Sequence, residues 1–344
     1  MKKLLITGTA GFIGSHLVEY ILSHTDDIHI TSLDKLDYAG HTMNLEHIPG
    51  GIASDRHRFV TGSICDRKLV DELLSDGYDG LINVAAQTHV DRAFYHPEFF
   101  IENNVVGVLN LLRAVEEHKV RRYMQISTDE VYGASSPDKP CGEDAPLKPG
   151  NYYASSKAAA DMYVLAAINS KDIDAAIIRG TNNFGPRQYP EKLIPFFTRR
   201  ILAGETLPLY GDGLQMRDWL FVKDFCRAIW LVYNKGEKGQ IYNAGADNHT
   251  SNLEMSKRML SVLGADESRI NYIADRPGHD FCYSVKWDKI SELGWAAKSD
   301  FNTSLEETIK WYRDNKKWVD TILAKSQDHP SDAKFFENHY KNHS

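Results

Sequence analysis

A tyrosine and a lysine stand one helical turn apart in the segment Tyr153-Ala154-Ser155-Ser156-Lys157. The segment begins a helical pattern, and residues at i and i+4 lie on one face of a helix. Because an ammonium beside a phenol favours the phenolate, we expect Lys157 to lower the pKa of Tyr153 towards the range of a general base. The pair therefore predicts a site of proton transfer.

A hydroxyl group and two carboxyl groups follow an apolar run earlier in the chain. The run Tyr123-Met124-Gln125-Ile126 predicts a buried strand, and Ser127-Thr128-Asp129-Glu130 comes directly after it. Since neighbouring side chains on a strand point to opposite faces, both acids can serve one pocket only where the strand has become a turn or a helix start. The carboxyl end of a central parallel strand is a common ligand site. Alternatively, the two acids only cap a helix.

A glycine-rich turn near the N-terminus predicts phosphate binding. Leu4-Leu5-Ile6-Thr7 has the composition of a strand, Gly8, Gly11 and Gly14 follow with G-x-x-G-x-x-G spacing, and a helical pattern runs from Phe12 to about Ser23. Glycines let the backbone turn sharply and approach a pyrophosphate, which a helix N-terminus attracts. A purely structural strand-to-helix turn is the alternative.

An acid at the end of the second predicted strand points to the cofactor. Ile28-His29-Ile30-Thr31-Ser32-Leu33 ends at Asp34, twenty residues after Gly14. A carboxylate there accepts hydrogen bonds from ribose hydroxyls and repels a 2′-phosphate, so it favours NAD over NADP. Lys35, the next residue, weakens this preference for NAD. An exposed loop aspartate is the alternative.

The overall composition is that of an ordinary globular protein. The 344 residues are 42% hydrophobic and 25% charged, with a net charge of −7 and no basic run, which argues against nucleic acid or an anionic membrane as partner. The four cysteines are widely spaced, so neither a disulfide framework nor a metal site is expected. No apolar run is long enough for a membrane span or a signal peptide. We expect a cytoplasmic protein.

Further strands alternate with amphipathic segments. Arg58–Thr61, Gly80–Val84 and Ala175–Arg179 are predicted strands, and Asn104 to about Lys119 is a predicted helix. This alternation predicts an α/β fold with a doubly wound parallel sheet of Rossmann type. The small residues Ala85 and Ala86, at the end of one strand, suit the close approach of a flat cofactor.

The character of the chain changes near Gly180, where prolines and glycines cluster and the elements shorten. We predict an NAD-binding domain over 1–180, with 218–240 packing back onto it, and a smaller mixed α/β substrate domain over 181–344. Basic, amide and aromatic residues recur in the second part: Arg187, Lys192, Tyr210, Arg217, Asn243, Arg276 and His279. Together they favour a diphosphate-bearing substrate, although each alone is compatible with a solvated surface position.

These motifs resemble those of nucleotide-sugar 4,6-dehydratases of the dTDP-glucose type, within the extended short-chain dehydrogenase/reductase superfamily. The resemblance runs from Lys3 to roughly Val319. Besides the glycine turn and the tyrosine–lysine pair, it rests on residues 34–40, 89–92, 127–133, 182–186, 190–195, 217–219 and 275–280. The Thr-Asp-Glu triplet at 128–130 is the specific part, because related epimerases lack the carboxylate pair.

The resemblance implies a lyase reaction in three steps with NAD held throughout. Tyr153 takes the proton of the sugar 4-hydroxyl as hydride leaves C4, Lys157 supports Tyr153 and holds the nicotinamide ribose, and Thr128 binds the 4-oxygen. Glu130 then removes the C5 proton and Asp129, which must be neutral, protonates the departing 6-hydroxyl. Hydride returns to C6, which gives a 4-keto-6-deoxy sugar nucleotide.

The resemblance also implies which residues bind the ligands. The cofactor set is Gly8, Gly11, Phe12, Ile13, Gly14, Asp34, Lys35, Leu36, Asp37, Ser63, Ile64, Val84, Ala85, Ala86, Thr88, Asn103, Tyr153, Lys157 and Asn182. The substrate set is Thr88, Thr128, Asn183, Lys192, Leu193, Pro208, Tyr210, Arg217, Asn243, Arg276 and His279. Family members are usually homodimers that pair through two helices, here 104–118 and 153–169.

The sequence departs from the family pattern at several positions. Thr9 replaces a glycine, Ser63 replaces an aspartate that contacts adenine, Gln87-Thr88 replace Glu-Ser, Asn151-Tyr152 replace Ser-Pro, and Phe281-Cys282 replace two arginines. The last two of these differences leave the nucleotide base, thymine or uracil, and the sugar open. A UDP-sugar 4,6-dehydratase, a 4-epimerase or decarboxylase, and a non-catalytic NAD sensor remain as alternatives.

Overall fold

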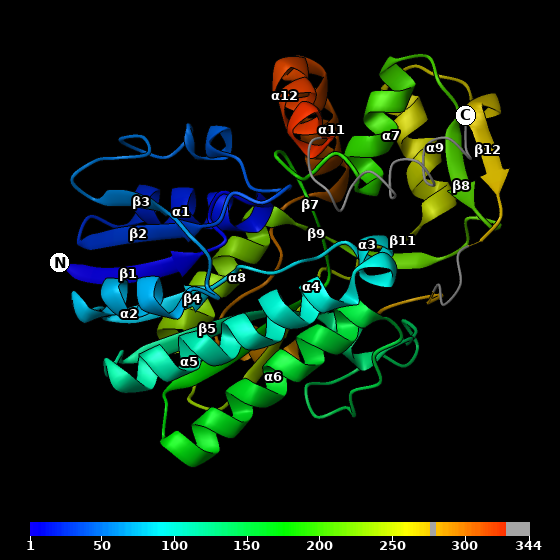
Figure 1. Ribbon diagram of the computed structural model, residues 1–344. Helices are drawn as coiled ribbons and strands as arrows, with labels where there is room; N and C mark the ends of the chain where they lie inside the picture. The colour runs from blue at the N-terminus through cyan, green and yellow to red at the C-terminus, as the bar shows by residue number, and fades with distance from the viewer. Residues whose placement is uncertain (276–279, 328–344) are drawn as a thin grey trace.

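Seven parallel strands form the larger sheet of the protein. The structure is a computed structural model that describes residues 1–275 and 280–327 (Figure 1). The strand order is β10-β6-β5-β4-β1-β2-β3. The strands are β1 (Lys2–Thr7), β2 (Ile28–Asp34), β3 (His57–Thr61), β4 (Gly80–Asn83), β5 (Arg122–Thr128), β6 (Ala175–Gly180) and β10 (Ile241–Ala244).

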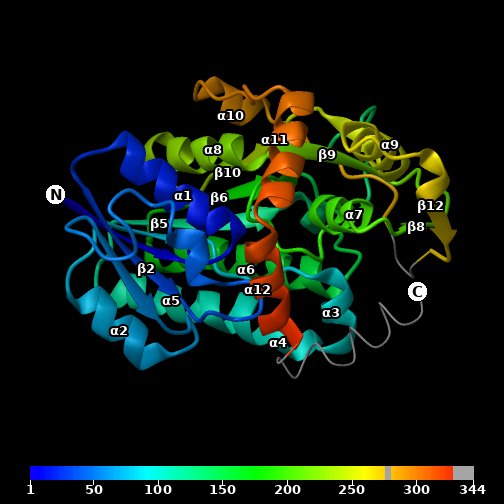
Figure 2. The ribbon, with the colours of Figure 1, turned by 90° about the horizontal axis from the view of Figure 1, so that it is seen from above.

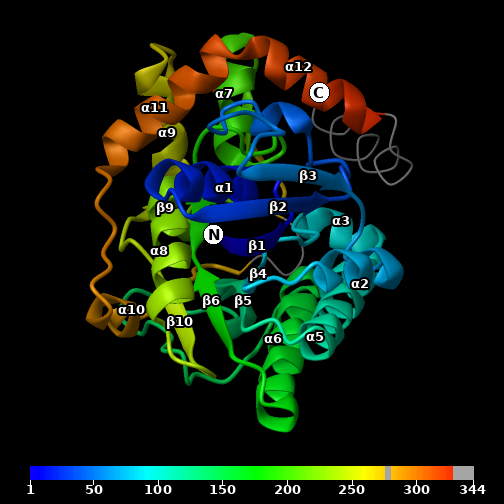
Figure 3. The ribbon, with the colours of Figure 1, turned by 90° about the vertical axis from the view of Figure 1, so that its left-hand side faces the viewer.

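Helices cover both faces of this sheet. One face carries α1 (Phe12–His24) and α8 (Val222–Lys235), and the other carries α2 (Arg67–Ser75), α5 (Gly107–Glu117) and α6 (Tyr152–Lys171) (Figure 3). Because both faces are covered, the central strands are buried along most of their length, and Leu4, Leu5 and Ile6 on β1 are almost completely inaccessible. The predicted doubly wound parallel sheet is confirmed.

Two features of this sheet differ from the expectations. The predicted helix from Asn104 begins as a π-helical turn, η2 (Glu102–Val106), which continues into α5, and two short helices precede it, α3 (Val90–Tyr95) and α4 (Pro97–Ile101). The seventh strand, β10, pairs with β6 from beyond residue 240. α8, which lies within 218–240, packs against α1 and β6, and β10 extends the segment that returns to this sheet to residue 244.

The rest of the chain forms a smaller mixed part. β7 (Asn182–Phe184), β9 (Met216–Phe221) and β11 (His249–Ser251) make one sheet, and β8 (Leu207–Tyr210) pairs with β12 (Ile270–Ile273). The remaining helices are α7 (Leu193–Leu202), α9 (Asn252–Val262), α10 (Asp288–Glu292), α11 (Phe301–Asp314) and α12 (Lys316–Gln327), with short 3-10 turns η1 (Thr42–Leu45), η3 (Asp129–Tyr132) and η4 (Glu267–Arg269).

The last two helices return to the edge of the large sheet. α11 and α12 run across the molecule from the smaller part to the loop after β2 (Figure 2). Tyr312, Trp318 and Ile322 pack there with Tyr38 and Tyr189 in a separate buried cluster. The ammonium of Lys325 donates hydrogen bonds to the backbone carbonyls of residues 36, 37 and 40, at 2.7–3.0 Å. The C-terminal helix therefore holds that loop in place.

Candidate active site

A cavity of about 300 Å³ lies at the carboxyl ends of the parallel strands. Of the predicted cofactor set it is lined by Gly8, Gly11, Phe12, Ile13, Gly14, Asp34, Lys35, Asp37, Ser63, Ile64, Val84, Ala85, Ala86, Thr88, Asn103, Tyr153 and Asn182. Of the predicted catalytic and substrate sets it is further lined by Thr128, Asp129, Glu130, Asn183 and Lys192. The two groups of predictions therefore meet in one cavity.

The glycine turn brings bare backbone to the cavity wall. Gly8 has φ +69°, and a Cβ there would lie 2.6 Å from the backbone nitrogen of Ala85. A Cβ on Gly14 would lie 2.1 Å from the carbonyl oxygen of Gly8. Gly11 precedes α1, whose first N–H groups receive no side-chain cap. These features fit a pyrophosphate at the start of the helix.

Asp34 is held by backbone at the end of β2. Its two carboxylate oxygens accept hydrogen bonds from the N–H groups of Ala10 (2.9 Å) and Leu36 (2.8 Å). Burial raises the pKa of Asp34, and these two donors partly offset the effect. The side chain of Leu36 does not line the cavity. Its part in the site is the backbone N–H that orients Asp34.

The acid pair lies where β5 ends. Asp129 starts the 3-10 turn η3, and the hydroxyl of Thr128 accepts a hydrogen bond from the N–H of Glu130 at 3.3 Å. Because β5 ends at Thr128, Asp129 and Glu130 both face the same cavity, which two neighbouring residues within a regular strand could not do. The side-chain amide of Asn151 donates to Glu130 at 3.2 Å.

Asp129 is buried and its pKa is raised to about 8, first by desolvation and then by the charge of Glu130. Thr128 donates a hydrogen bond to one carboxyl oxygen at 3.1 Å. The other oxygen has no hydrogen-bond partner within the described parts of the chain. Asp129 is therefore a neutral acid at pH 7, with a free O–H group or acceptor in the cavity wall.

Tyr153 and Lys157 lie on the first turns of α6. Asn151 caps the helix by accepting from the N–H of Ala154 at 2.8 Å. Tyr153 lines the cavity, while the ammonium of Lys157 is buried behind it and donates to the carbonyl of Ile126 at 2.6 Å. The side chain of Lys157 therefore does not line the cavity.

The pKa of Tyr153 differs from the expectation. Burial raises it above its ordinary value, the charge of Glu130 raises it further, and a hydrogen bond with Thr128 opposes both. Desolvation also lowers the pKa of Lys157 to about 8. The predicted lowering of the Tyr153 pKa is wrong for the protein by itself, because burial and the charge of Glu130 raise it.

Several predicted substrate residues lie away from the cavity. The side chain of Asn243 on β10 is fully buried, accepts from the Tyr132 hydroxyl, and donates to the carbonyls of Cys141 and Lys286. Its side-chain amide is thus bonded within the fold, and Asn243 does not line the cavity.

The guanidinium of Arg217 is likewise buried and donates to backbone carbonyls at 216, 280 and 281. Pro208 and Tyr210 lie on β8 and Leu193 begins α7, and none of the three lines the cavity. Arg276 and His279 lie outside the described residues.

The cavity also contains residues that sequence reasoning did not assign. Gln87, Gln188, Tyr189 and Glu191 are among the polar ones, together with Tyr38, Ser127 and Thr181. The carboxylate of Glu191 is buried, 3.4 Å from the guanidinium of Arg92. A signal was present for Glu191, which lies in the segment 190–195 that carried the family resemblance, whereas Gln87 stands at a position where the sequence departs from the family pattern.

Comparison with known proteins identifies the family of this chain. A model of the NAD dependent epimerase/dehydratase family matches residues 4–245. The chain belongs to this family. A dTDP-glucose 4,6-dehydratase from Streptomyces niveus is 42% identical over 327 residues, which cover 94% of this chain and 96% of that protein. The low-salt glycan biosynthesis protein Agl12 from Haloferax volcanii is 44% identical over 309 residues, which cover 90% and 98%.

Solved structures of this epimerase/dehydratase family agree with the fold. The crystal structure of DesIV, a dTDP-glucose 4,6-dehydratase from Streptomyces venezuelae with NAD bound, has a TM-score of 0.90 at 41% identity and covers 93% of this chain and 99% of its own. A UDP-glucose 4-epimerase from Thermotoga maritima has a TM-score of 0.84 at 26% identity, with coverage of 91% and 99%. The resemblance to 4,6-dehydratases is confirmed.

Neither a membrane-spanning helix nor a metal-binding cluster is found in the part of the chain that the structure describes. No helix in residues 1–275 and 280–327 combines the length and apolar character needed to cross a membrane. The same residues contain no group of three or more His, Cys, Asp and Glu side chains placed to hold a metal ion.

Proposed function

We propose that the protein is an NAD-dependent 4,6-dehydratase that converts dTDP-glucose to the 4-keto-6-deoxy sugar nucleotide. Relatives with this activity are about as long as this chain and share 39–42% of its residues. The observation that carries the proposal is the pair Asp129 and Glu130 beside Tyr153 in one cavity. Elimination of water requires an acid and a base at once, and this pair can supply both.

The two carboxyl groups have different environments. Asp129 is fully buried with a pKa of about 8, so it keeps its proton at pH 7. Glu130 is only half-buried and accepts a hydrogen bond from the side-chain amide of Asn151. Two nearby carboxyls in unlike surroundings divide into an acid and a base.

The chain's own groups then account for each proton. Tyr153 takes the proton of the 4-hydroxyl, with Thr128 beside the same oxygen. Burial and the charge of Glu130 oppose ionisation of the phenol. An ammonium one helical turn on, that of Lys157, would favour the ionised phenol once both groups face the substrate. Glu130 removes the C5 proton and returns it to C5 as hydride adds to C6, and Asp129 protonates the 6-hydroxyl, which leaves as water. NAD, when bound, supplies the hydride acceptor at C4 and the hydride donor at C6.

The same cavity suits the two ligands. The uncapped start of α1 and the glycine turn would hold the pyrophosphate of NAD, and Asp34 its adenosine ribose. Asn183 and Lys192 line the cavity beside the catalytic group and are the polar residues proposed for the nucleotide sugar. The ammonium of Lys192 donates to the carbonyl of Thr88 at 3.2 Å.

The test is incubation of the NAD-saturated protein with dTDP-glucose, UDP-glucose and UDP-N-acetylglucosamine in turn, with products weighed by mass spectrometry. Loss of one water from dTDP-glucose alone is the expected result, and Tyr153→Phe should abolish it. Loss of water from a UDP-sugar would move the proposal to that substrate. An isomer of unchanged mass, or loss of carbon dioxide, would refute the dehydratase.

We also propose that the protein is a homodimer through the helices of residues 104–118 and 153–169. α5 and α6 lie side by side (Figure 1). Large apolar side chains are exposed along these helices and the turns before them, among them Ile101, Val106, Met162 and Tyr163 at 44–57%. Such a patch is typical of an interface.

Light scattering tests the dimer. Val106→Lys with Met162→Lys should give a monomer, whereas Val262→Lys, at an exposed apolar position on α9, should leave the dimer intact. A double variant of unchanged mass would place the interface elsewhere.

A further inference from the structure

Two residues of opposite charge lie at the end of β2, where an adenosine ribose would bind. Asp34 would accept hydrogen bonds from ribose hydroxyls and repel a 2′-phosphate. Lys35, the next residue, also lines the cavity and carries the charge that attracts a phosphate. The preference between NAD and NADP therefore depends on where the Lys35 ammonium is held.

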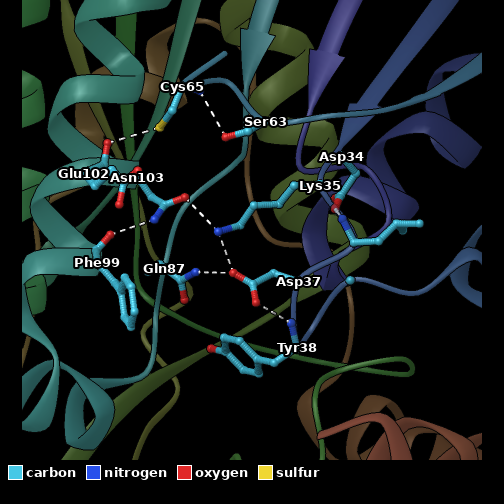
Figure 4. Close-up of polar contacts among 12 residues, drawn as sticks. Asp34, Lys35, Asp37, Tyr38, Ser63, Cys65, Gln87, Phe99, Glu102 and Asn103 are labelled. Carbon is cyan, nitrogen blue, oxygen red and sulfur yellow. Dashed lines mark hydrogen bonds and ion pairs between the residues drawn. The ribbon is translucent and has the colours of Figure 1, made fainter. Parts of the chain in front are cut away.

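Asp37 holds that ammonium (Figure 4). The Lys35 Nζ lies 2.5 Å from Oδ2 of Asp37 and donates to Oδ1 of Asn103 at 2.9 Å. The Lys35 and Asp37 side chains are 35% and 17% exposed. The ion pair is thus partly withdrawn from solvent, which strengthens it relative to a surface pair.

Other groups fix the pair in this position. Oδ2 of Asp37 also accepts from Nε2 of Gln87 at 2.6 Å, and Oδ1 accepts from the N–H of Tyr38 at 2.8 Å. The amide of Asn103 is oriented by its own hydrogen bond to the carbonyl of Phe99, at 2.8 Å. Because the partners come from the loops after β2 and β4 and from η2, the ammonium is anchored by three separate segments (Figure 4).

We propose that Asp37 sets the preference for a dinucleotide without a 2′-phosphate, because it binds Lys35 and keeps the ammonium from the adenosine ribose. With Asp37 charged, residues 34, 35 and 37 together carry one net negative charge at this end of the cavity. Without that charge, Lys35 is released to pair with a 2′-phosphate. The proposal rests on the dinucleotide site of the proposed function and adds the residue that selects between the two cofactors.

Binding of NAD and of NADP to the cofactor-free full-length protein, followed by calorimetry, tests the proposal. Asp37→Asn keeps an acceptor for the Tyr38 N–H and removes the charge. It should tighten NADP binding by about 10-fold or more, the size of one added charge-assisted contact, and change NAD binding much less. The double variant Lys35→Met/Asp37→Asn should lose this gain. Asp26→Asn, which makes the same charge change at an exposed site before β2, should show no gain.

Each other outcome has a definite meaning. An unchanged ratio of NADP to NAD affinity in Asp37→Asn would overturn the proposal, and so would a gain that survives removal of Lys35. If Asp37→Asn does not fold, as judged by circular dichroism, Asp37→Thr supplies a second uncharged variant for the same measurement. Failure of the unaltered protein to bind either dinucleotide would instead refute the proposed function.

Discussion

Replacing Asp129 by asparagine should make the protein more stable and remove its acid. Asparagine has the same shape and can still accept the hydrogen bond from Thr128. It cannot ionise, and it cannot give a proton to a leaving hydroxyl. The substitution therefore separates the part of Asp129 in catalysis from its part in the folded structure.

The size of the effect follows from the pKa of Asp129, which folding raises from 3.8 to about 8. Between these values the folded protein holds a proton that the unfolded chain has released, so stability falls as pH rises, by about 1.4 kcal/mol per pH unit. At pH 7, roughly three units above the unfolded pKa, the full effect is about 4 kcal/mol. Access of water to the cavity reduces this, so we expect Asp129→Asn to gain between about 1 and 4 kcal/mol.

Thermal unfolding of the NAD-saturated proteins between pH 4 and pH 8 measures this gain. An unfolding entropy of about 0.7 kcal/mol per degree for 344 residues converts the gain at pH 7 to roughly 1–6 °C in Tm. The difference between variant and parent should grow with pH and vanish near pH 4. Turnover of Asp129→Asn should fall by about 10²–10⁴, the usual contribution of a general acid.

Two results would refute this reasoning. One is an Asp129→Asn protein whose Tm difference from the parent does not change with pH. The other is a variant that keeps its turnover, which would assign the acid to another group. Asp138→Asn, at an exposed aspartate, is the matched control and should shift neither Tm nor turnover.

Three further substitutions test other parts of the structure. Asp161→Asn should destabilise the protein by about 3–5 kcal/mol in urea unfolding, because the buried guanidinium of Arg179, 2.9 Å from Asp161, loses its counter-charge; a loss below 1 kcal/mol would contradict this. Lys325→Met should speed release of NAD, measured by stopped-flow fluorescence, because the ammonium no longer ties three carbonyls of the loop after β2; an unchanged rate would show that the apolar packing of α12 suffices. Gly8→Ala should prevent NAD binding in calorimetry, since its Cβ would lie 2.6 Å from the backbone nitrogen of Ala85. An unchanged affinity for NAD would show that the backbone of the turn shifts to accept the Cβ.

Predictions that rest on a few consecutive residues agree with the structure better than predictions that depend on the surroundings of a side chain. Strand and helix periods, the glycine turn and the i, i+4 spacing of Tyr153 and Lys157 are properties of a few consecutive residues. They predicted the large sheet and the glycine turn at the cavity, whereas most of the other residues expected in the cavity wall came from the family resemblance. The pKa of Tyr153 depends on atoms brought from distant segments, and there the sequence-based expectation was wrong. The side chain of Asn243 is likewise held by distant segments and does not line the cavity.

The sequence by itself determined the parallel sheet, the end of β5 at an acid pair, and the residues that meet at the strand ends, because these follow from short-range pattern and from the geometry of parallel sheets. Tertiary structure decided the rest. It buried Asp129 enough to keep it protonated, brought β10 into the sheet, and laid Lys325 against the loop after β2. Desolvation and long-range pairing depend on which surfaces pack together, and no short stretch of sequence encodes that.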